Sequence, residues 1–285
     1  MIKLHNKHIT AKINKVGAEI VSLCVDGVER TWPGKEGVWA RSGPVLFPIC
    51  GGLKDGKFEY GGTEYSLEKH GFAKNSEFTV KSKTKKSVVL ELLSSPETLA
   101  VYPFEFCLTV TFTLTRYSVL VEYTIKNLNS GEMYFSIGSH ESYLCDGGIE
   151  NYDIIFKKQE SLDNNLIEGG YVSESTEPIL RHGRILPLYK RYFETDSLVI
   201  KNMRSRSLIL RNRITGQRTQ LDFPGCDYFV IWTIPSEDYI CLEPWAGLPD
   251  TTVSTGKFAE KEGIIRLKKG AKRRFAHKIT FLPEL

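Results

Sequence analysis

Short runs of alternating apolar and polar residues recur along the whole chain. A period of two is typical of strands with one buried face. The runs are separated by turns rich in glycine, proline and aspartate. They cover residues 8–15, 18–31, 77–82, 86–93, 105–115, 118–127, 152–157, 197–201, 206–211, 217–221, 227–233, 238–242 and 274–281. Because such runs return about every 8–12 residues, the pattern predicts an all-β protein, built as an antiparallel sandwich or barrel.

Few segments depart from this pattern. Residues 96–102 predict one short helix, and residues 253–261 predict a single helical turn. The prolines around Val45–Ile49 make that apolar run unsuitable for a central strand. No internal repeat and no low-complexity linker interrupts the chain, so we expect one domain over residues 1–285.

The run from Tyr134 to Tyr143 draws attention to a site. Tyr134 to Ser139 alternates and predicts one buried strand, and the polar segment Gly-Ser-His-Glu-Ser-Tyr follows at once. His140 is therefore expected at the mouth of a strand, where it can act on a ligand in a cleft. A histidine packed and hydrogen-bonded in the core is the structural alternative.

Composition excludes several classes of protein. Hydrophobic residues make up 41% of the chain and charged residues 25%, with a net charge of +4, which is ordinary for a globular protein. The basic cluster at residues 268–274 lacks interleaved aromatic residues and a nucleic-acid-binding motif, so we interpret it as a solvated turn between strands. No apolar run approaches the roughly 20 residues that a membrane span needs, and no signal peptide is recognised.

The cysteines point to a reducing compartment. All six are widely spaced and form no C-x-x-C pair, which argues against a disulfide framework and against a structural zinc site. We therefore expect a cytoplasmic protein without a bound metal.

Four polar residues at strand ends are candidates for chemistry: His70, His140, Asp196 and Glu243. Glu243 lies between an apolar strand and a Pro-Trp-Ala-Gly turn. Partial desolvation there raises a carboxyl pKa and makes the group a better base near neutral pH. Trp245 can stack on the apolar face of a sugar ring. The structural alternatives are a strand-end cap for Glu243, a turn-forming role for Asp196 and a backbone-bonded loop histidine for His70.

Seven short motifs come in an order that resembles the aldose 1-epimerase (mutarotase) family, and within it the LacX-like branch. They span nearly the whole chain. They are Pro44–Ile49, Leu53–Gly56, His70–Ala73, Tyr102–Phe104, Gly138–His140, Phe193–Asp196 and Glu243–Gly247. The resemblance implies a large antiparallel β-sandwich, the galactose mutarotase-like supersandwich.

The resemblance also implies roles for individual residues. Glu243 matches the catalytic base, and His140 matches the catalytic acid. His70 matches the histidine that binds the sugar near its ring oxygen, and Asp196 matches an aspartate that binds sugar hydroxyls.

This chain departs from the family at two positions. Gly52 stands where many members carry a sugar-binding arginine, and Lys54 or Arg41 are the candidates to compensate. Glu141 follows His140 where many members have proline. Both departures bear on which sugar is preferred.

The expected activity is interconversion of the anomers of a free aldose by general acid and base catalysis, with no metal, no cofactor and a small-molecule sugar as partner. One group takes the proton of the C1 hydroxyl while the other protonates the ring oxygen. The expected protein is a monomer or weak homodimer that binds neither nucleic acid nor membrane. The alternatives are a non-catalytic carbohydrate-binding protein, a hexose-6-phosphate mutarotase, and a glycoside hydrolase that uses Asp196 and Glu243 as a carboxylate pair.

Overall fold

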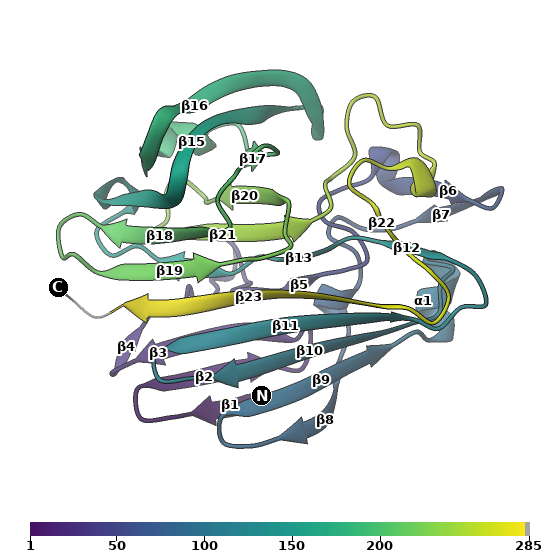
Figure 1. Ribbon diagram of the computed structural model, residues 1–285, viewed down its shortest axis with the longest axis horizontal. Coiled ribbons are helices and arrows are strands. Elements are labelled where there is room, and N and C mark those ends of the chain that lie inside the picture. The colour runs from purple at the N-terminus through teal and green to yellow at the C-terminus, as the bar shows by residue number, and fades with distance from the viewer. Residues whose placement is uncertain (283–285) are drawn as a thin grey trace.

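The computed structural model describes residues 1–282; residues 283–285, the end of the predicted domain, lie outside the described residues. The largest element is a nine-stranded sheet, which Figure 1 shows crossing the molecule from β8 at the bottom to β16 at the top. In spatial order its strands are β16 (Tyr171–Pro187), β15 (Tyr152–Glu168), β18 (Ser207–Asn212), β19 (Arg218–Asp222), β23 (Lys272–Leu282), β11 (Ser118–Asn127), β10 (Phe106–Leu114), β9 (Ser87–Leu93) and β8 (Thr79–Lys83). All its pairings are antiparallel.

A second, smaller sheet carries the site described below. Its order is β17 (Leu198–Ile200), β20 (Tyr228–Trp232), β21 (Tyr239–Ala246), β13 (Ile137–Ser139) and β5 (Val45–Leu46), and β14 (Ser142–Leu144) also pairs with β21. As expected from its prolines, the Val45 segment forms only a two-residue edge strand.

Smaller units complete the fold. The N-terminal sheet comprises β1 (Ile2–His5), β2 (Ile9–Asn14), β3 (Glu19–Val25) and β4 (Val28–Glu29). There are also two two-stranded sheets. One pairs β6 (Lys57–Tyr60) with β7 (Thr63–Ser66), and the other pairs β12 (Met133–Phe135) with β22 (Ile265–Leu267). The predicted helix is α1 (Pro96–Val101), and a 3₁₀ turn at Phe258–Glu260 is the predicted helical turn.

The core lies between the sheets and follows directly from the alternation. Along β10 buried and half-buried residues alternate without a break, and β11 matches it in register. The buried positions of both strands join one large apolar cluster with residues of β3, β20 and β21. The predicted all-β sandwich is therefore confirmed. Within residues 1–282, no helix is both long and apolar enough to cross a membrane.

Two predicted elements need correction. The strand predicted at Tyr134–Ser139 is divided between β12 and β13, because β12 pairs with β22 whereas β13 pairs with β21 and β5. At this change of partner the Ser136 amide donates to the Pro48 carbonyl instead of to a strand. The strand predicted at residues 152–157 runs on to Glu168 and pairs with β16, which the pattern did not predict. Register shifts along this hairpin interrupt the alternation that would have indicated it.

Candidate active site

One face of β21 supplies the floor of the candidate site. Cys241, Glu243 and Trp245 share this face because side chains alternate along a strand. Ile240 and Leu242 point the other way and belong to the main core. The small sheet therefore anchors itself in the core with one face and presents a carboxylate and an indole on the other.

A cavity of about 310 Å³ lies over this floor, a size within the usual range for small-molecule sites of roughly 300–1,000 Å³. It is lined by six of the seven predicted site residues, which come from distant parts of the sequence. These are Arg41, His70, His140, Asp196, Glu243 and Trp245. The β15–β16 hairpin, which arches at the top of Figure 1, contributes Ile167 near its tip.

Glu243 is almost completely buried, with 1% of its surface exposed. Burial raises the pKa of its carboxyl well above the ordinary value, although the positive charge of Lys69 opposes the rise. Its Oε2 atom accepts no hydrogen bond from residues 1–282. A buried, unsatisfied carboxyl oxygen in a cavity is available to a ligand hydroxyl.

His140 follows β13 directly, and close packing fixes where that strand ends. The Trp245 indole donates from Nε1 to the Ser139 carbonyl at 3.1 Å. The same ring leaves no room for a side chain at Gly138, where a Cβ would lie 2.5 Å from Trp245 Cδ1. On its other side the His140 ring lies 5.0 Å from the Trp39 ring, centroid to centroid.

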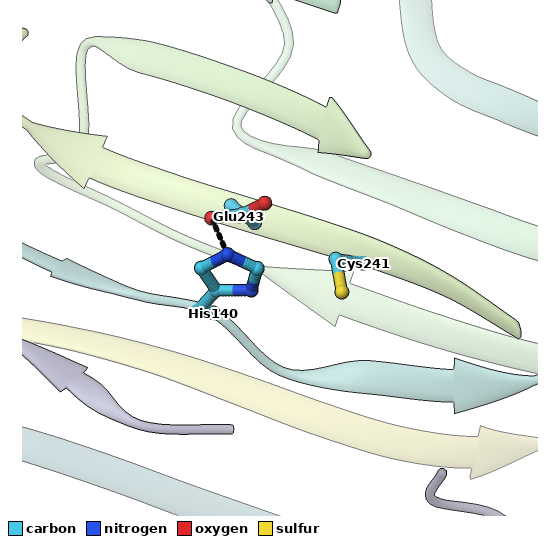
Figure 2. A group of neighbouring side chains, drawn as sticks. All are labelled: His140, Cys241 and Glu243. Atoms are coloured by element: carbon cyan, nitrogen blue, oxygen red, sulfur yellow. Dashed lines mark ion pairs between the residues drawn. The ribbon is translucent and has the colours of Figure 1, made fainter. Parts of the chain in front are cut away.

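The two candidate catalytic side chains meet at the bottom of the cavity. Figure 2 shows the His140 ring pointing at Glu243, with Nε2 of His140 3.5 Å from Oε2 of Glu243. Burial lowers the pKa of His140 to about 4. The histidine and the carboxyl are thus both pushed toward their uncharged forms.

His70 adopts a backbone conformation that a non-glycine residue takes rarely, with φ of 70°. Its amide donates to the Gly51 carbonyl, and its Nδ1 accepts from the Gly51 amide at 3.1 Å. In the neutral ring the hydrogen therefore sits on Nε2. Burial, reinforced by His140, lowers the pKa of His70 well below 6.5, so the ring is a neutral N–H donor.

The two residues expected to replace the missing arginine are placed differently. Arg41 lines the cavity, but its guanidinium is held by Glu19 and by the Lys74 carbonyl, each at 3.1 Å. Lys54 does not line this cavity, and its Nζ lies 3.5 Å from the Thr252 carbonyl. Gly52 does line it, and a Cβ there would meet nothing within 4 Å.

Asp196 lies at the cavity wall just before β17. Its Oδ1 accepts the amide of Ser197 at 2.7 Å, so the side chain shapes the start of the strand. Its charge also acts to raise the pKa of Glu243. The carboxyl groups of Asp196 and Glu243 therefore face the same cavity.

Comparison with known proteins now decides the family. The model of the aldose 1-epimerase family matches residues 1–274. The chain belongs to the aldose 1-epimerase family. The plasmid-encoded protein LacX of Lactococcus lactis subsp. lactis is 29% identical over 274 residues, which is 91% of each chain.

Solved structures agree with this family membership. A galactose mutarotase-like protein from Lactobacillus casei is 29% identical, with a TM-score of 0.94 over 99% of this chain and 100% of its own. A galactose mutarotase related enzyme from Lactobacillus acidophilus is 27% identical, with a TM-score of 0.91 over 99% and 97% of the two chains. The predicted family, its LacX-like branch and the mutarotase-like sandwich are confirmed.

In this member of the aldose 1-epimerase family, the cavity lining also includes residues that the sequence patterns did not single out as site residues, among them Trp39, Trp232 and Lys69. The two tryptophans offer ring faces beside His140. Lys69 has no ion-pair or hydrogen-bond partner within residues 1–282. Its place beside His70 in the sequence was the available signal, but nothing in the pattern distinguishes it from the many surface lysines.

Cys241 completes a group with the two candidate catalytic residues. Potential ligand atoms of His140, Cys241 and Glu243 all lie within 4.8 Å of one another (Figure 2). Burial raises the pKa of the Cys241 thiol well above its ordinary value. Since metals bind the thiolate, this protonated thiol is a poor ligand.

Proposed function

We propose that the protein is an aldose 1-epimerase that interconverts the α and β anomers of a free aldose by ring opening and closure. The observation that carries the proposal is the contact between Nε2 of His140 and Oε2 of Glu243 at the floor of the cavity. A hemiacetal needs one acceptor for the C1 hydroxyl proton and one donor for the ring oxygen, side by side.

The reaction needs only these two groups. Glu243 takes the proton from the C1 hydroxyl, the bond from C1 to the ring oxygen breaks, and His140 protonates that oxygen. The open chain rotates about the C1–C2 bond. When the hydroxyl formed from the ring oxygen adds to the other face of the aldehyde, His140 takes back its proton and Glu243 returns a proton to the aldehyde oxygen, which restores both residues.

Burial prepares the pair for this exchange. Because both groups favour their uncharged forms, a neutral imidazole beside a carboxylic acid holds one proton in total. The imidazolium–carboxylate pair, which contains the acid and the base, holds the same number. One proton shift within the pair or through a bound sugar hydroxyl therefore generates the reactive form without exchange with solvent.

The remaining lining residues bind the sugar. The Nε2 hydrogen of His70 is directed at a ring or hydroxyl oxygen, and Asp196 accepts from sugar hydroxyls. Trp245 supplies an apolar face. None of these contacts requires a cofactor.

A second candidate substrate is a 6-phosphorylated aldose. Lys69 supports it, because an unpaired cation at a cavity wall is suited to a phosphate. Arg41 and Lys74 also line the cavity, but they are paired with Glu19 and Glu68. Among the described residues that line the cavity, this leaves Lys69 as the one free cation, where tight phosphate binding commonly uses a bidentate arginine.

Anomer exchange on a panel of free and 6-phosphorylated aldoses, followed by NMR saturation transfer, tests the function. We expect acceleration above the spontaneous rate for at least one free aldose. Acceleration for phosphorylated sugars alone selects the second candidate. Binding of sugars with no acceleration for any of them contradicts the enzyme and identifies a carbohydrate-binding protein.

A further inference from the structure

A buried ion pair lies directly behind the cavity. Nε2 of His277 is 2.8 Å from Oε1 of Glu141, and their side chains are 2% and 6% exposed. Neither residue lines the cavity. Although the two groups are close, neither Nε2 of His277 nor the second oxygen of Glu141 has an aligned hydrogen-bond partner within residues 1–282. Such a pair costs desolvation energy and is weak evidence for stability, so another role has to be considered.

The pair connects the two sheets of the sandwich. His277 lies on β23, the middle strand of the nine-stranded sheet, with its side chain on the buried face. Glu141 lies between β13 and β14 of the small sheet. His140 faces the cavity while its neighbour Glu141 faces the core, as successive residues of extended backbone do.

The backbone of Glu141 is also tied to the strand that carries Glu243. The Leu242 amide donates to the Glu141 carbonyl at 3.1 Å. Leu242 stands between Cys241 and Glu243 in β21. A shift of Glu141 would consequently change the position of His140 relative to Glu243.

We propose that Glu141 and His277 are positioning residues of the site: their ion pair fastens the His140 turn to the nine-stranded sheet and keeps a carboxylate behind the acid/base pair. This rests on the proposed function. The side-chain contact between Glu141 and β23 holds this turn in place.

The charges around Glu141 agree with this role. Burial acts to raise the Glu141 pKa, but His277, Ser139 and the backbone together more than offset it, so the pKa is lowered and the group stays a carboxylate. Four titratable groups surround Glu141, on β11, β14, β21 and the loop between β19 and β20. They are uncharged near neutral pH because burial raises the pKa of each. They are Tyr123, Tyr143, Cys226 and Cys241. The Glu141 charge therefore acts on His140 and Glu243 without competition from these groups, and it favours the protonated form of both.

Glu141→Gln tests the proposal, with Asp153→Asn as the matched control. Asp153 is a buried carboxylate in an ion pair with Arg211, at 2.6 Å, and it does not line the cavity. We expect Glu141→Gln to lower kcat by at least about tenfold through misplacement of His140, with KM changed much less. The pH profile of kcat should also move to lower pH. Asp153→Asn should lose stability and leave kcat and its pH profile unchanged.

A second readout keeps the test independent of activity. The imidazole of His140, labelled with ¹⁵N, is titrated in wild type, Glu141→Gln and His277→Gln. His277→Gln serves if the first variant does not fold. The proposal expects the His140 pKa to fall in Glu141→Gln. If Glu141→Gln has the His140 pKa and the kcat profile of the wild type, the proposal is overturned. If the His140 pKa falls in Glu141→Gln but the wild type has no epimerase activity, only the proposed function is overturned.

Discussion

Nε2 of His140 and Oε2 of Glu243 lie 3.5 Å apart, yet no aligned hydrogen bond joins them. Glu243 lies on β21 and His140 directly follows β13, and each side chain is nearly removed from water. A satisfied pair would have its proton locked in place. In this pair Oε2 of Glu243 remains free to accept a hydrogen bond from a ligand hydroxyl.

The first prediction concerns pH. His140 has a pKa of about 4. Below that pH the pair holds two protons and contains no base, so kcat should fall as the pH drops through about 4. Glu243 has a raised pKa, and kcat should fall again when the pair loses its last proton on the alkaline side. Rates measured by NMR from pH 3.5 upward, corrected for spontaneous exchange, check this. An acid limb centred near 6.5, the value of an exposed imidazole, would contradict it.

Replacing Lys69 should shift the pH profile of kcat in the opposite direction to replacing Glu141. Its charge lowers the pKa of both His140 and Glu243. Lys69→Gln should therefore move both limbs of the kcat profile to higher pH. Lys54→Gln, which changes a lysine outside the cavity, is the control and should leave the profile in place. A shift in the same direction as Glu141→Gln would show that the electrostatic account is wrong.

Two glycines near the cavity differ in how well they would tolerate a side chain. Gly71 has φ of 70°, and a Cβ there would lie 2.4 Å from the Phe47 carbonyl oxygen. Gly71→Ala should lower the free energy of unfolding by more than about 1 kcal/mol and displace the neighbouring His70. Gly52→Ala, where a Cβ has open space, should be nearly neutral. Urea unfolding of both variants measures the difference, and equal stabilities would contradict the packing described for this loop.

Much of the fold could be predicted because the alternating pattern and the burial agree. The strand at residues 118–127 is an example, since the structure has β11 with the predicted bounds. The β16 strand could not be found this way. Most of its side chains are exposed or half-buried on both faces, so its residues carry little alternation. The division of the strand predicted at residues 134–139 into β12 and β13 was hidden for the opposite reason, because nearly every position there is buried.

Motifs marked several of the residues that the structure brings to one cavity. His140, Glu243, His70 and Asp196 came from short segments with recognisable neighbours, and the structure brings all four to one cavity. His277 carries no such mark. Its position in an alternating strand predicts only an inward-facing residue, and the contact with Glu141 depends on how two sheets pack, which no local pattern records.

Metal removal is the next prediction. The Cys241 thiol has a pKa raised by burial and offers no thiolate, and the proposed reaction uses His140 and Glu243 as proton carriers. Exhaustive treatment with EDTA should leave the exchange rate unchanged. Loss of activity that one divalent ion restores would refute this and would point to the His140–Cys241–Glu243 group as a metal centre.

The central claim is that His140 and Glu243 act together in one proton-coupled step. Glu243→Gln removes the acceptor and His140→Asn removes the donor, while both keep similar shape. Each should lower kcat for anomer exchange by at least about 10²-fold. KM should change much less, because His70, Asp196 and Trp245 remain. The control Glu160→Gln changes another buried carboxylate, one bonded to Ser205 away from the cavity, and should keep the wild-type rate.

The most direct measurement is anomer exchange by NMR in wild type, the two single variants and the double variant, at saturating sugar. The account predicts a double variant little slower than either single one, because removing one member already disables the step. Losses that multiply in the double variant, or single variants that exchange anomers at the wild-type rate, would contradict it.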